Sequence, residues 1–288
     1  MKIGFYTAAL GELEIDKVLE WASQAGFKSL EISAWPESKH LNLRKPSSLE
    51  DIRRRAETRG MTVSSLGYYA NNLDADRAKR ARHISHLKDL IVAAGESAIG
   101  IVSTFAGANL QLDFDQNIHE FVEVFGPIAD LARQHDVKIA IENCPMLDDR
   151  SAPTNIAFSP QNWSIMLKEL GASNVGLELD PSHLVWQFID PVNATSKFSQ
   201  KVFVVHLKDT EIFRERLNEI GIMGQGWWRY RLPGFGQIDW PKFFKSLADG
   251  GFDGCMNIEH EDPVWSGTEE KIKEGLTRSL AYLERRVG

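Results

Sequence analysis

Length, composition and charge exclude several classes of protein. The chain of 288 residues is 43% hydrophobic and 25% charged, which is typical of a folded protein with a sizeable core and argues against disorder. A formal net charge of −7 without a basic stripe argues against a nucleic-acid surface, and no run approaches the roughly 20 apolar residues of a membrane span. We therefore expect a small-molecule partner, and neither a nucleic-acid nor a membrane partner.

The start of the chain and its cysteines indicate a cellular compartment. Met1 leads directly into a strand pattern without the apolar segment of a signal peptide, and Cys144 and Cys255 are the two cysteines. Two thiols are too few for a disulfide framework or a cysteine-rich zinc site, and they suit a reducing compartment. We predict a cytoplasmic protein in which both cysteines serve packing. The sequence leaves a homo-oligomer open.

Strand patterns alternate with helix patterns along the chain. Apolar, strand-like runs are predicted at 2–6, 29–32, 62–66, 98–103, 137–141, 175–179, 202–205 and 255–258. Helices are predicted at about 16–25, 47–59, 76–94, 117–135, 159–170, 240–247 and 268–285, with Ser48 as one N-cap and Gly95 as one stop. Between 210 and 239 the periodicity is lost, and the glycine-rich and tryptophan-rich composition is typical of a functional loop.

Eight strand patterns with intervening helices favour a closed (β/α)8 TIM barrel of the α/β class, formed by a single domain over 1–288. An open, doubly wound sheet shows the same alternation. Polar side chains follow strands five to eight, and a barrel brings four successive strand ends around one axis. No linker, composition shift or internal repeat divides the sequence.

Four side chains able to bind a metal come at the ends of strands five to eight: Glu142, Asp180, His206 and Glu259. Three carboxylates in one pocket would repel one another, and a divalent cation removes that repulsion. Oxygen-rich ligation with one nitrogen suits Mn²⁺, Mg²⁺ or Co²⁺ better than Zn²⁺, although ligand type alone leaves zinc open. We predict a site for one divalent metal, with Mn²⁺ as the first choice. Glu261 is the alternative to Glu259, because it points to the same side of a continuing strand.

Two further residues border this predicted site. His183 lies one turn beyond Asp180 and is either a fifth ligand or a hydrogen-bond partner of the substrate. Lys208 follows His206 on the same side of its strand, which places an ammonium beside the site. Lys208 either contacts substrate or forms a salt bridge with one of the carboxylates.

The long loop carries other candidates for substrate contact. Arg214, Arg229 and Arg231 would hold an anionic or polyhydroxylated substrate, and solvated surface arginines are the alternative. Aromatic faces near the strand ends and in the loop would suit the C–H surfaces of a sugar, although core packing explains some of them equally well. These tryptophans are Trp35, Trp186, Trp227 and Trp228.

Several short motifs together resemble a known family. They are Asp180-Pro-Ser-His183, His206-Leu-Lys-Asp209, Pro233-Gly-Phe-Gly236 before Asp239-Trp240, Ile258-Glu-His and Ile141-Glu142-Asn143. Over essentially the whole chain they resemble the sugar phosphate isomerase/epimerase family, also called the xylose isomerase-like TIM barrel superfamily. The resemblance implies metal ligands at Glu142, Asp180, His206 and Glu259, and a substrate-contacting His183.

One position departs from the pattern of the ketose 3-epimerases in this family. Their strand-seven histidine is followed six residues later by a substrate-binding arginine, and Ile212 holds that position here. The departure argues against simple ketohexose epimerisation, with Arg214 as the residue that would substitute.

The predicted residues support chemistry on a sugar next to a ketone. A metal that holds a ketone oxygen and an adjacent hydroxyl acidifies the carbon between them and stabilises the resulting enediolate. Glu142 and Glu259 are the predicted catalytic bases, and removal of a proton on one face with return on the other would be epimerisation. We predict a metal-dependent sugar isomerase or epimerase. A lyase on a 3-keto sugar, keto-glycoside or inosose is the alternative, and a non-enzymatic sugar-binding barrel or an endonuclease is less well supported.

Overall fold

Eight parallel strands close into a barrel, as the sequence predicts. The computed structural model describes residues 1–44, 48–147 and 152–287. Around the barrel the order is β1 (Lys2–Tyr6), β10 (Cys255–Ile258), β7 (Val202–Leu207), β6 (Val175–Leu179), β5 (Lys138–Glu142), β4 (Ile101–Thr104), β3 (Thr62–Tyr68) and β2 (Ser29–Ser33). Pairing of Lys2 with Cys255 joins β1 and β10, the first and last barrel strands along the chain, and closes the sheet.

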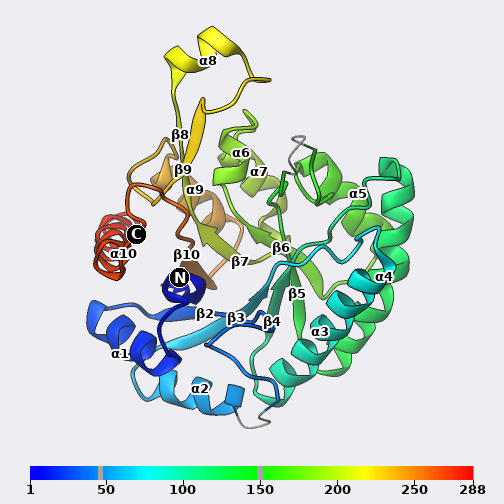
Figure 1. Cartoon of the computed structure of the whole chain (residues 1–288), viewed down its shortest axis with the longest axis horizontal. Coiled ribbons are helices and arrows are strands. Elements are labelled where there is room, and N and C mark those ends of the chain that lie inside the picture. The colour runs from blue at the N-terminus through cyan, green and yellow to red at the C-terminus, as the bar shows by residue number, and fades with distance from the viewer. Residues whose placement is uncertain (45–47, 148–151, 288) are drawn as a thin grey trace.

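Helices surround the barrel on the outside (Figure 1). They are α1 (Ile15–Ala25), α2 (Ser48–Glu57), α3 (Arg77–Glu96), α4 (Phe114–Gln134), α5 (Pro160–Leu170), α9 (Trp240–Asp249) and α10 (Glu269–Glu284). Shorter helical segments are η1 (Thr7–Leu10), α6 (Ser182–Val185), α7 (Pro191–Phe198) and η2 (Ser199–Lys201). Within the described ranges, no helix combines the length and the apolar character needed to cross a bilayer.

Local signals set several helix boundaries where they were predicted. The Ser159 hydroxyl accepts a hydrogen bond from the Asn162 N–H at 3.3 Å, Pro160 opens α5, and Gly171 ends it with a left-handed φ of 64°. Ser48 is the first residue of α2 rather than the residue before it. The predicted start of that helix at residue 47 lies outside the described residues.

The predicted end of α3 at Gly95 is wrong. The helix continues to Glu96, and β4 begins at Ile101 rather than at 98, because Ala98 turns the chain with a φ of 54°. A Cβ on Gly95 would lie 2.6 Å from the His135 carbonyl oxygen. Glycine is therefore required here by close packing against the end of α4, and not by helix termination.

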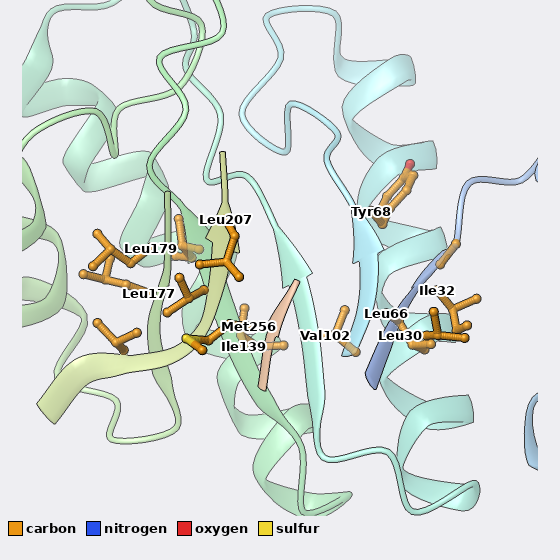
Figure 2. Packing of buried hydrophobic residues seen from close by; sticks show 14 of the residues in the cluster. Leu30, Ile32, Leu66, Tyr68, Val102, Ile139, Leu177, Leu179, Leu207 and Met256 are labelled. Atoms are coloured by element: carbon orange, nitrogen blue, oxygen red, sulfur yellow. The ribbon is translucent and has the colours of Figure 1, made fainter. Parts of the chain in front are cut away.

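The barrel interior is polar, whereas the sheet's outer side is apolar. Along β2, Leu30 and Ile32 belong to the hydrophobic core, and Figure 2 shows them with other apolar strand residues in this cluster. The alternate residue Glu31 is fully buried and lies 3.1 Å from His206 of β7, a strand that does not neighbour β2. Side chains of such distant strands meet only inside the barrel. Gly67 leaves room for this carboxylate, since a Cβ there would come within 2.4 Å of it.

The region from 210 to 239 contains regular structure, contrary to the prediction of an aperiodic loop. Two short strands, β8 (Asp209–Ile212) and β9 (Trp228–Arg231), pair antiparallel outside the barrel, with α8 (Arg214–Ile220) between them. Figure 1 shows this hairpin projecting beyond the end of β7, with α8 at its tip. Each strand is four residues long, which is too short for a clear periodic pattern.

Candidate metal centre and active site

Four barrel strands bring the predicted ligands to one end of the barrel. Glu142 is the last residue of β5, Asp180 follows β6, His206 lies near the end of β7, and Glu259 follows β10. Asp180 and His206 are fully buried, and the side chain of Glu259 is 14% exposed. Parallel strands of a barrel all point their carboxyl ends to the same face, so these residues converge although they are far apart in sequence.

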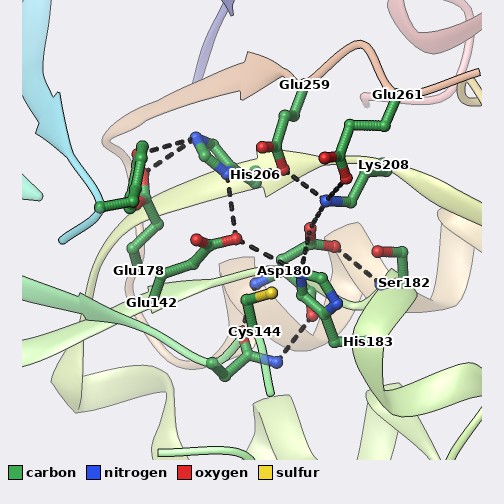
Figure 3. Close-up of polar contacts among 12 residues, drawn as sticks. Glu142, Cys144, Glu178, Asp180, Ser182, His183, His206, Lys208, Glu259 and Glu261 are labelled. Carbon is green, nitrogen blue, oxygen red and sulfur yellow. Dashed lines mark hydrogen bonds and ion pairs between the residues drawn. The ribbon is translucent and has the colours of Figure 1, made fainter. Parts of the chain in front are cut away.

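The His206 ring faces two of the carboxylates. Its Nδ1 lies 3.4 Å from Glu142 Oε1 and 3.1 Å from Glu259 Oε2. Figure 3 shows the ring between Glu142 on one side and Glu178 on the other, with Glu259 next to it. Glu142 and Glu259 therefore border the same small volume from two strands.

A second imidazole borders the carboxylates. His183 Nε2 lies 3.2 Å from Asp180 Oδ2 and 3.4 Å from Glu142 Oε1. One potential ligand atom each of Glu142, Asp180, His183 and Glu259 lies within 4.8 Å of the others. Two histidines, rather than His206 alone, thus compete for contact with a cation at this place.

Two buried polar atoms indicate that the residues fit a cation. Among the described residues, Asp180 Oδ2 and His206 Nδ1 have no hydrogen-bond partner of good geometry. Each has a charged neighbour, since Asp180 Oδ2 lies 3.1 Å from Lys208 Nζ and His206 Nδ1 lies 3.1 Å from Glu259 Oε2, but neither atom makes a well-directed hydrogen bond. A divalent ion that accepts their lone pairs would satisfy both atoms. The other oxygen of Asp180 is fixed by the Ser182 N–H at 2.8 Å, and the Asp180 main chain is held by Asn143.

Lys208 lies inside the site. Its ammonium contacts Glu259 and Glu261 at 2.6 Å each and Asp180 at 3.1 Å, and Figure 3 shows it between these carboxylates. Burial alone would lower the pKa of Lys208, but Asp180 and both glutamates raise it well above its usual value. Burial alone would raise the pKa of Glu259, but Lys208 and His206 hold it well below its usual value. Glu261, at 47% side-chain exposure, thus pairs with Lys208 beside the candidate ligands.

A buried network behind His206 was missed in the sequence. His206 Nε2 lies 3.1 Å from Glu31 and 3.2 Å from Glu178, and the Tyr69 hydroxyl contacts both carboxylates. Burial raises the pKa of Glu178 well above its usual value, and the charge of Glu31 adds to this. The signal that could have found both glutamates is a lone carboxylate inside an apolar strand run, Ser29-Leu-Glu-Ile-Ser33 and Val175-Gly-Leu-Glu-Leu179.

Cys144 and Tyr230 surround His183. The Tyr230 hydroxyl lies 2.8 Å from His183 Nδ1, and the Lys208 ammonium lies 4.4 Å from the centre of the Tyr230 ring. Burial raises the pKa of the Cys144 thiol, although the neighbouring His183 opposes that rise. Cys144 therefore lies beside the candidate site (Figure 3), a position that its prediction as a packing residue did not include.

The three arginines of the long loop do not join the carboxylates. Arg229 and Arg231 both pair with Glu211, at 2.8 and 2.6 Å, and Arg231 also pairs with buried Asp262 at 2.8 Å. Arg214 is exposed at the start of α8, with its guanidinium 5.9 Å from the centre of the Phe188 ring. Arg229 and Arg231 thus anchor the hairpin, and Arg214 lies beside the Phe188 ring instead.

The fold and these strand ends define a class, a closed (β/α)8 barrel with a buried group of carboxylates and imidazoles at the carboxyl ends of its strands. Within this class the chain belongs to the xylose isomerase-like TIM barrel family, whose sequence model matches residues 19–284. The resemblance seen in the sequence motifs is thereby confirmed.

Relatives of known sequence cover most of the chain. The Bacillus subtilis (strain 168) protein YfiH is 26% identical over 325 aligned positions, which span 100% of this chain and 99% of YfiH. An inosose dehydratase of Clostridium botulinum (strain Alaska E43 / Type E3) is 22% identical over 88% of this chain and 84% of its own length.

Solved structures share the fold. An L-ribulose 3-epimerase superposes with a TM-score of 0.76 at 17% identity, covering 99% of this chain and 94% of that chain. The IolI protein with a bound zinc atom gives a TM-score of 0.73 at 21% identity, over 99% of this chain and 96% of that chain. A 3-keto-D-glucoside 4-epimerase from E. coli, YcjR, gives 0.75 at 14% identity and covers 99% of both chains.

Proposed function

We propose that this chain is a divalent-metal-dependent enzyme that removes a proton from the carbon next to a ketone in a sugar or sugar-like polyol, and so acts as an isomerase or epimerase. The observation that carries the proposal is the approach of Glu142 Oε1 and Glu259 Oε2 to the same ring atom, His206 Nδ1. A relative by sequence, an inosose dehydratase, and a structural neighbour, an L-ribulose 3-epimerase, support this reaction class.

The proposed ligands are Glu142, Asp180, His206 and Glu259, and Mn²⁺ is the proposed metal. Hydrogen bonding favours His206 over His183 as the nitrogen ligand. His206 Nε2–H donates to the carboxylates behind it, which leaves the Nδ1 lone pair for a cation. The Tyr230 hydroxyl occupies His183 Nδ1 at 2.8 Å. Burial alone would lower the pKa of His183, but Cys144, Tyr230 and Asp180 raise it well above its usual value, so His183 Nε2–H faces the carboxylates as a donor. His183 then suits a substrate oxygen.

The two glutamates supply the proposed proton transfers. When bound, a divalent cation would polarise the ketone and stabilise the negative charge that develops as the proton leaves. Glu142 and Glu259 come from strands β5 and β10, which are not neighbours in the barrel, so they approach a substrate carbon from different directions. A proton taken by one and returned by the other to the same carbon gives epimerisation, and return to the neighbouring carbon gives isomerisation.

Lys208 favours a second candidate function, a lyase on a keto sugar, keto-glycoside or inosose. Its ammonium lies 2.6 Å from Glu259 and helps to hold the pKa of that carboxyl group well below its usual value, which makes Glu259 a weak base. An acid next to one carboxylate would protonate a leaving group after the other carboxylate has removed the α-proton.

The proposed partner in either case is a small carbohydrate. The cytoplasmic location and the oligomeric state stay predictions from the sequence.

Proton NMR in D2O tests the proposal. Incubation of Mn²⁺-loaded protein with ketoses, keto-glycosides and inososes should give deuterium at the carbon next to the ketone of at least one compound. Deuterium with inversion or ketone transfer indicates an epimerase or isomerase, and loss of a substituent indicates a lyase. Glu142→Gln or Glu259→Gln should slow the exchange about a hundredfold or more. Glu261→Gln is the matched control and should slow it far less. Exchange at the wild-type rate in both variants would contradict the assignment.

A further inference from the structure

Aromatic side chains form a continuous group that leads away from the candidate active site. This outer aromatic group comprises Trp186, Phe188, Trp227, Trp228 and Tyr230, from the segment after α6 and from the end of the hairpin at β9. Trp186 and Trp228 stack in parallel with ring centres 4.7 Å apart, and Phe188 and Trp227 stack at 5.8 Å. Trp228 contacts Tyr230 edge-on at 4.8 Å.

The inner end of the group belongs to the site itself. Tyr230 packs edge-on against His183 with ring centres 5.3 Å apart, and its hydroxyl is hydrogen-bonded to Nδ1 of that ring. The Lys208 ammonium lies over the Tyr230 face at 4.4 Å. A molecule bound at the carboxylates therefore has aromatic side chains next to it on the side of the hairpin.

The outer end of the group is open to solvent. Phe188 is 52% exposed, whereas Trp227 beneath it is 4% exposed and is explained by packing. Phe188 also adopts a left-handed φ of 59°, which is unusual for a bulky residue, and the Val185 and Leu184 carbonyls hold the turn by accepting hydrogen bonds at 3.0 and 2.9 Å. These two bonds form the left-handed turn that commonly ends a helical segment, so the conformation of Phe188 is explained by the end of α6. The exposure of its ring, at the outer end of a group that reaches His183, is the observation that indicates a surface for a ligand.

We propose that the outer aromatic group is a binding subsite for the glycosidic substituent of a keto-glycoside, whose ketone-bearing ring reacts at the carboxylates. The inference rests on the proposed function and names its substrate class. A sugar ring or an aryl group presents an apolar ring face, and aromatic side chains bind such faces. Continuity with His183 and Lys208 favours part of the substrate as the occupant over a second copy of the chain. The exposed Arg214 beside Phe188 would contact the polar edge of that substituent.

The test compares three probes by calorimetric titration of the metal-loaded protein: methyl, phenyl and glucosyl 3-keto-glucosides. The phenyl or the glucosyl compound should bind about tenfold more tightly than the methyl compound, as expected for one ring stack. Phe188→Gly removes the ring and tolerates the positive φ, and it should reduce this preference to about threefold or less. Met223→Ala is the control, because Met223 is 92% exposed on the same hairpin outside the aromatic group, and it should leave the preference intact.

The outcomes separate the subsite from the proposed function. Metal-dependent α-proton exchange on the methyl compound, with equal affinity for all three probes, would overturn the subsite alone. A preference that Phe188→Gly leaves unchanged would also overturn it. Absence of binding and of exchange for every probe would overturn both proposals. A change from dimer to monomer caused by Phe188→Gly in light scattering would assign the surface to a second copy of the chain and overturn the subsite.

Discussion

Two buried carboxylates behind His206 set the orientation of its ring. The Tyr69 hydroxyl contacts both Glu31 and Glu178, and burial together with the charge of Glu31 raises the pKa of Glu178 well above its usual value. We therefore expect Glu178 to hold a proton and Glu31 to be the main acceptor of the His206 Nε2–H, at 3.1 Å. Such acceptors raise the basicity of a ligating imidazole and fix its ring.

We therefore expect two similar substitutions to differ. Glu31→Gln removes the charged acceptor and should weaken Mn²⁺ binding about 10- to 100-fold in calorimetric titration. Glu178→Gln replaces a protonated carboxyl group with an amide of the same shape and should weaken binding much less. Ser103→Ala, at another buried position of a barrel strand, is the control and should leave Mn²⁺ binding unchanged. Equal losses in both glutamine variants would contradict the assignment of the proton to Glu178.

Lys208 supplies a positive charge to the site when metal is absent. Lys208→Met leaves Asp180 and Glu259 as buried carboxylates without their ammonium partner, which should lower the free energy of unfolding of the metal-free protein by about 3–5 kcal/mol near neutral pH. Added Mn²⁺ should recover part of this loss, because the cation restores the charge balance. Urea denaturation with and without Mn²⁺ measures both effects. Lys245→Met, in an exposed pair with Asp249, is the control.

The loss of unfolding free energy in Lys208→Met should depend on pH with a definite sign. The folded-state pKa values of Asp180 and Glu259 are lowered, so their contribution is present above the unfolded values of about 4 and is lost as the pH falls through the lowered values. The pKa of Lys208 is raised, so its contribution is present below about 10 and is lost as the pH rises further. The difference between wild type and Lys208→Met should be largest between these limits. A difference that stays constant with pH would indicate lost packing instead.

At the scale of elements, a buried arginine helps to fix the β8–β9 hairpin to the barrel. Arg231, with 10% side-chain exposure, joins Glu211 of the hairpin to the fully buried Asp262 beyond β10. Arg231→Met leaves Asp262 buried without a cationic partner, with only the Leu232 and Val264 N–H groups donating to it, and should lower the free energy of unfolding by about 3 kcal/mol in urea denaturation. Arg229→Met, which removes a more exposed partner of the same Glu211, should lower it by at most about 1 kcal/mol. Equal losses would mean that Asp262 does not depend on Arg231.

Element boundaries were predicted best where the side chains signal them locally. Ser159 and Gly171 bound α5 as expected, because a hydroxyl cap and a left-handed glycine act within one turn. The hairpin was missed because each of its strands is four residues long, too short for a clear periodic pattern. The substrate contact of Arg214 stays a prediction, and the sequence did not show that the folding of α8 places this residue beside Phe188.

At the scale of the whole molecule, the barrel followed from the order of strands and helices, because parallel strands joined by crossovers have few ways to bury both faces. The strand-end positions of Glu142, Asp180, His206 and Glu259 followed for the same reason. Contacts across the interior could not be predicted in this way. Glu31 and His206 are 175 positions apart, and their contact depends on which face of each strand turns inward and on the closure of the barrel.

The central claim is that residues from β5, β6, β7 and β10 together hold one divalent cation. Equilibrium dialysis of the metal-free protein against Mn²⁺, followed by elemental analysis, measures the number of ions bound per chain. The account predicts one Mn²⁺ per chain for the wild type, and a large loss for Asp180→Ala, which removes a fully buried carboxylate with one oxygen that makes no well-directed hydrogen bond. Wild-type protein that binds no Mn²⁺, or an Asp180→Ala variant that binds it as well as the wild type, would contradict the account.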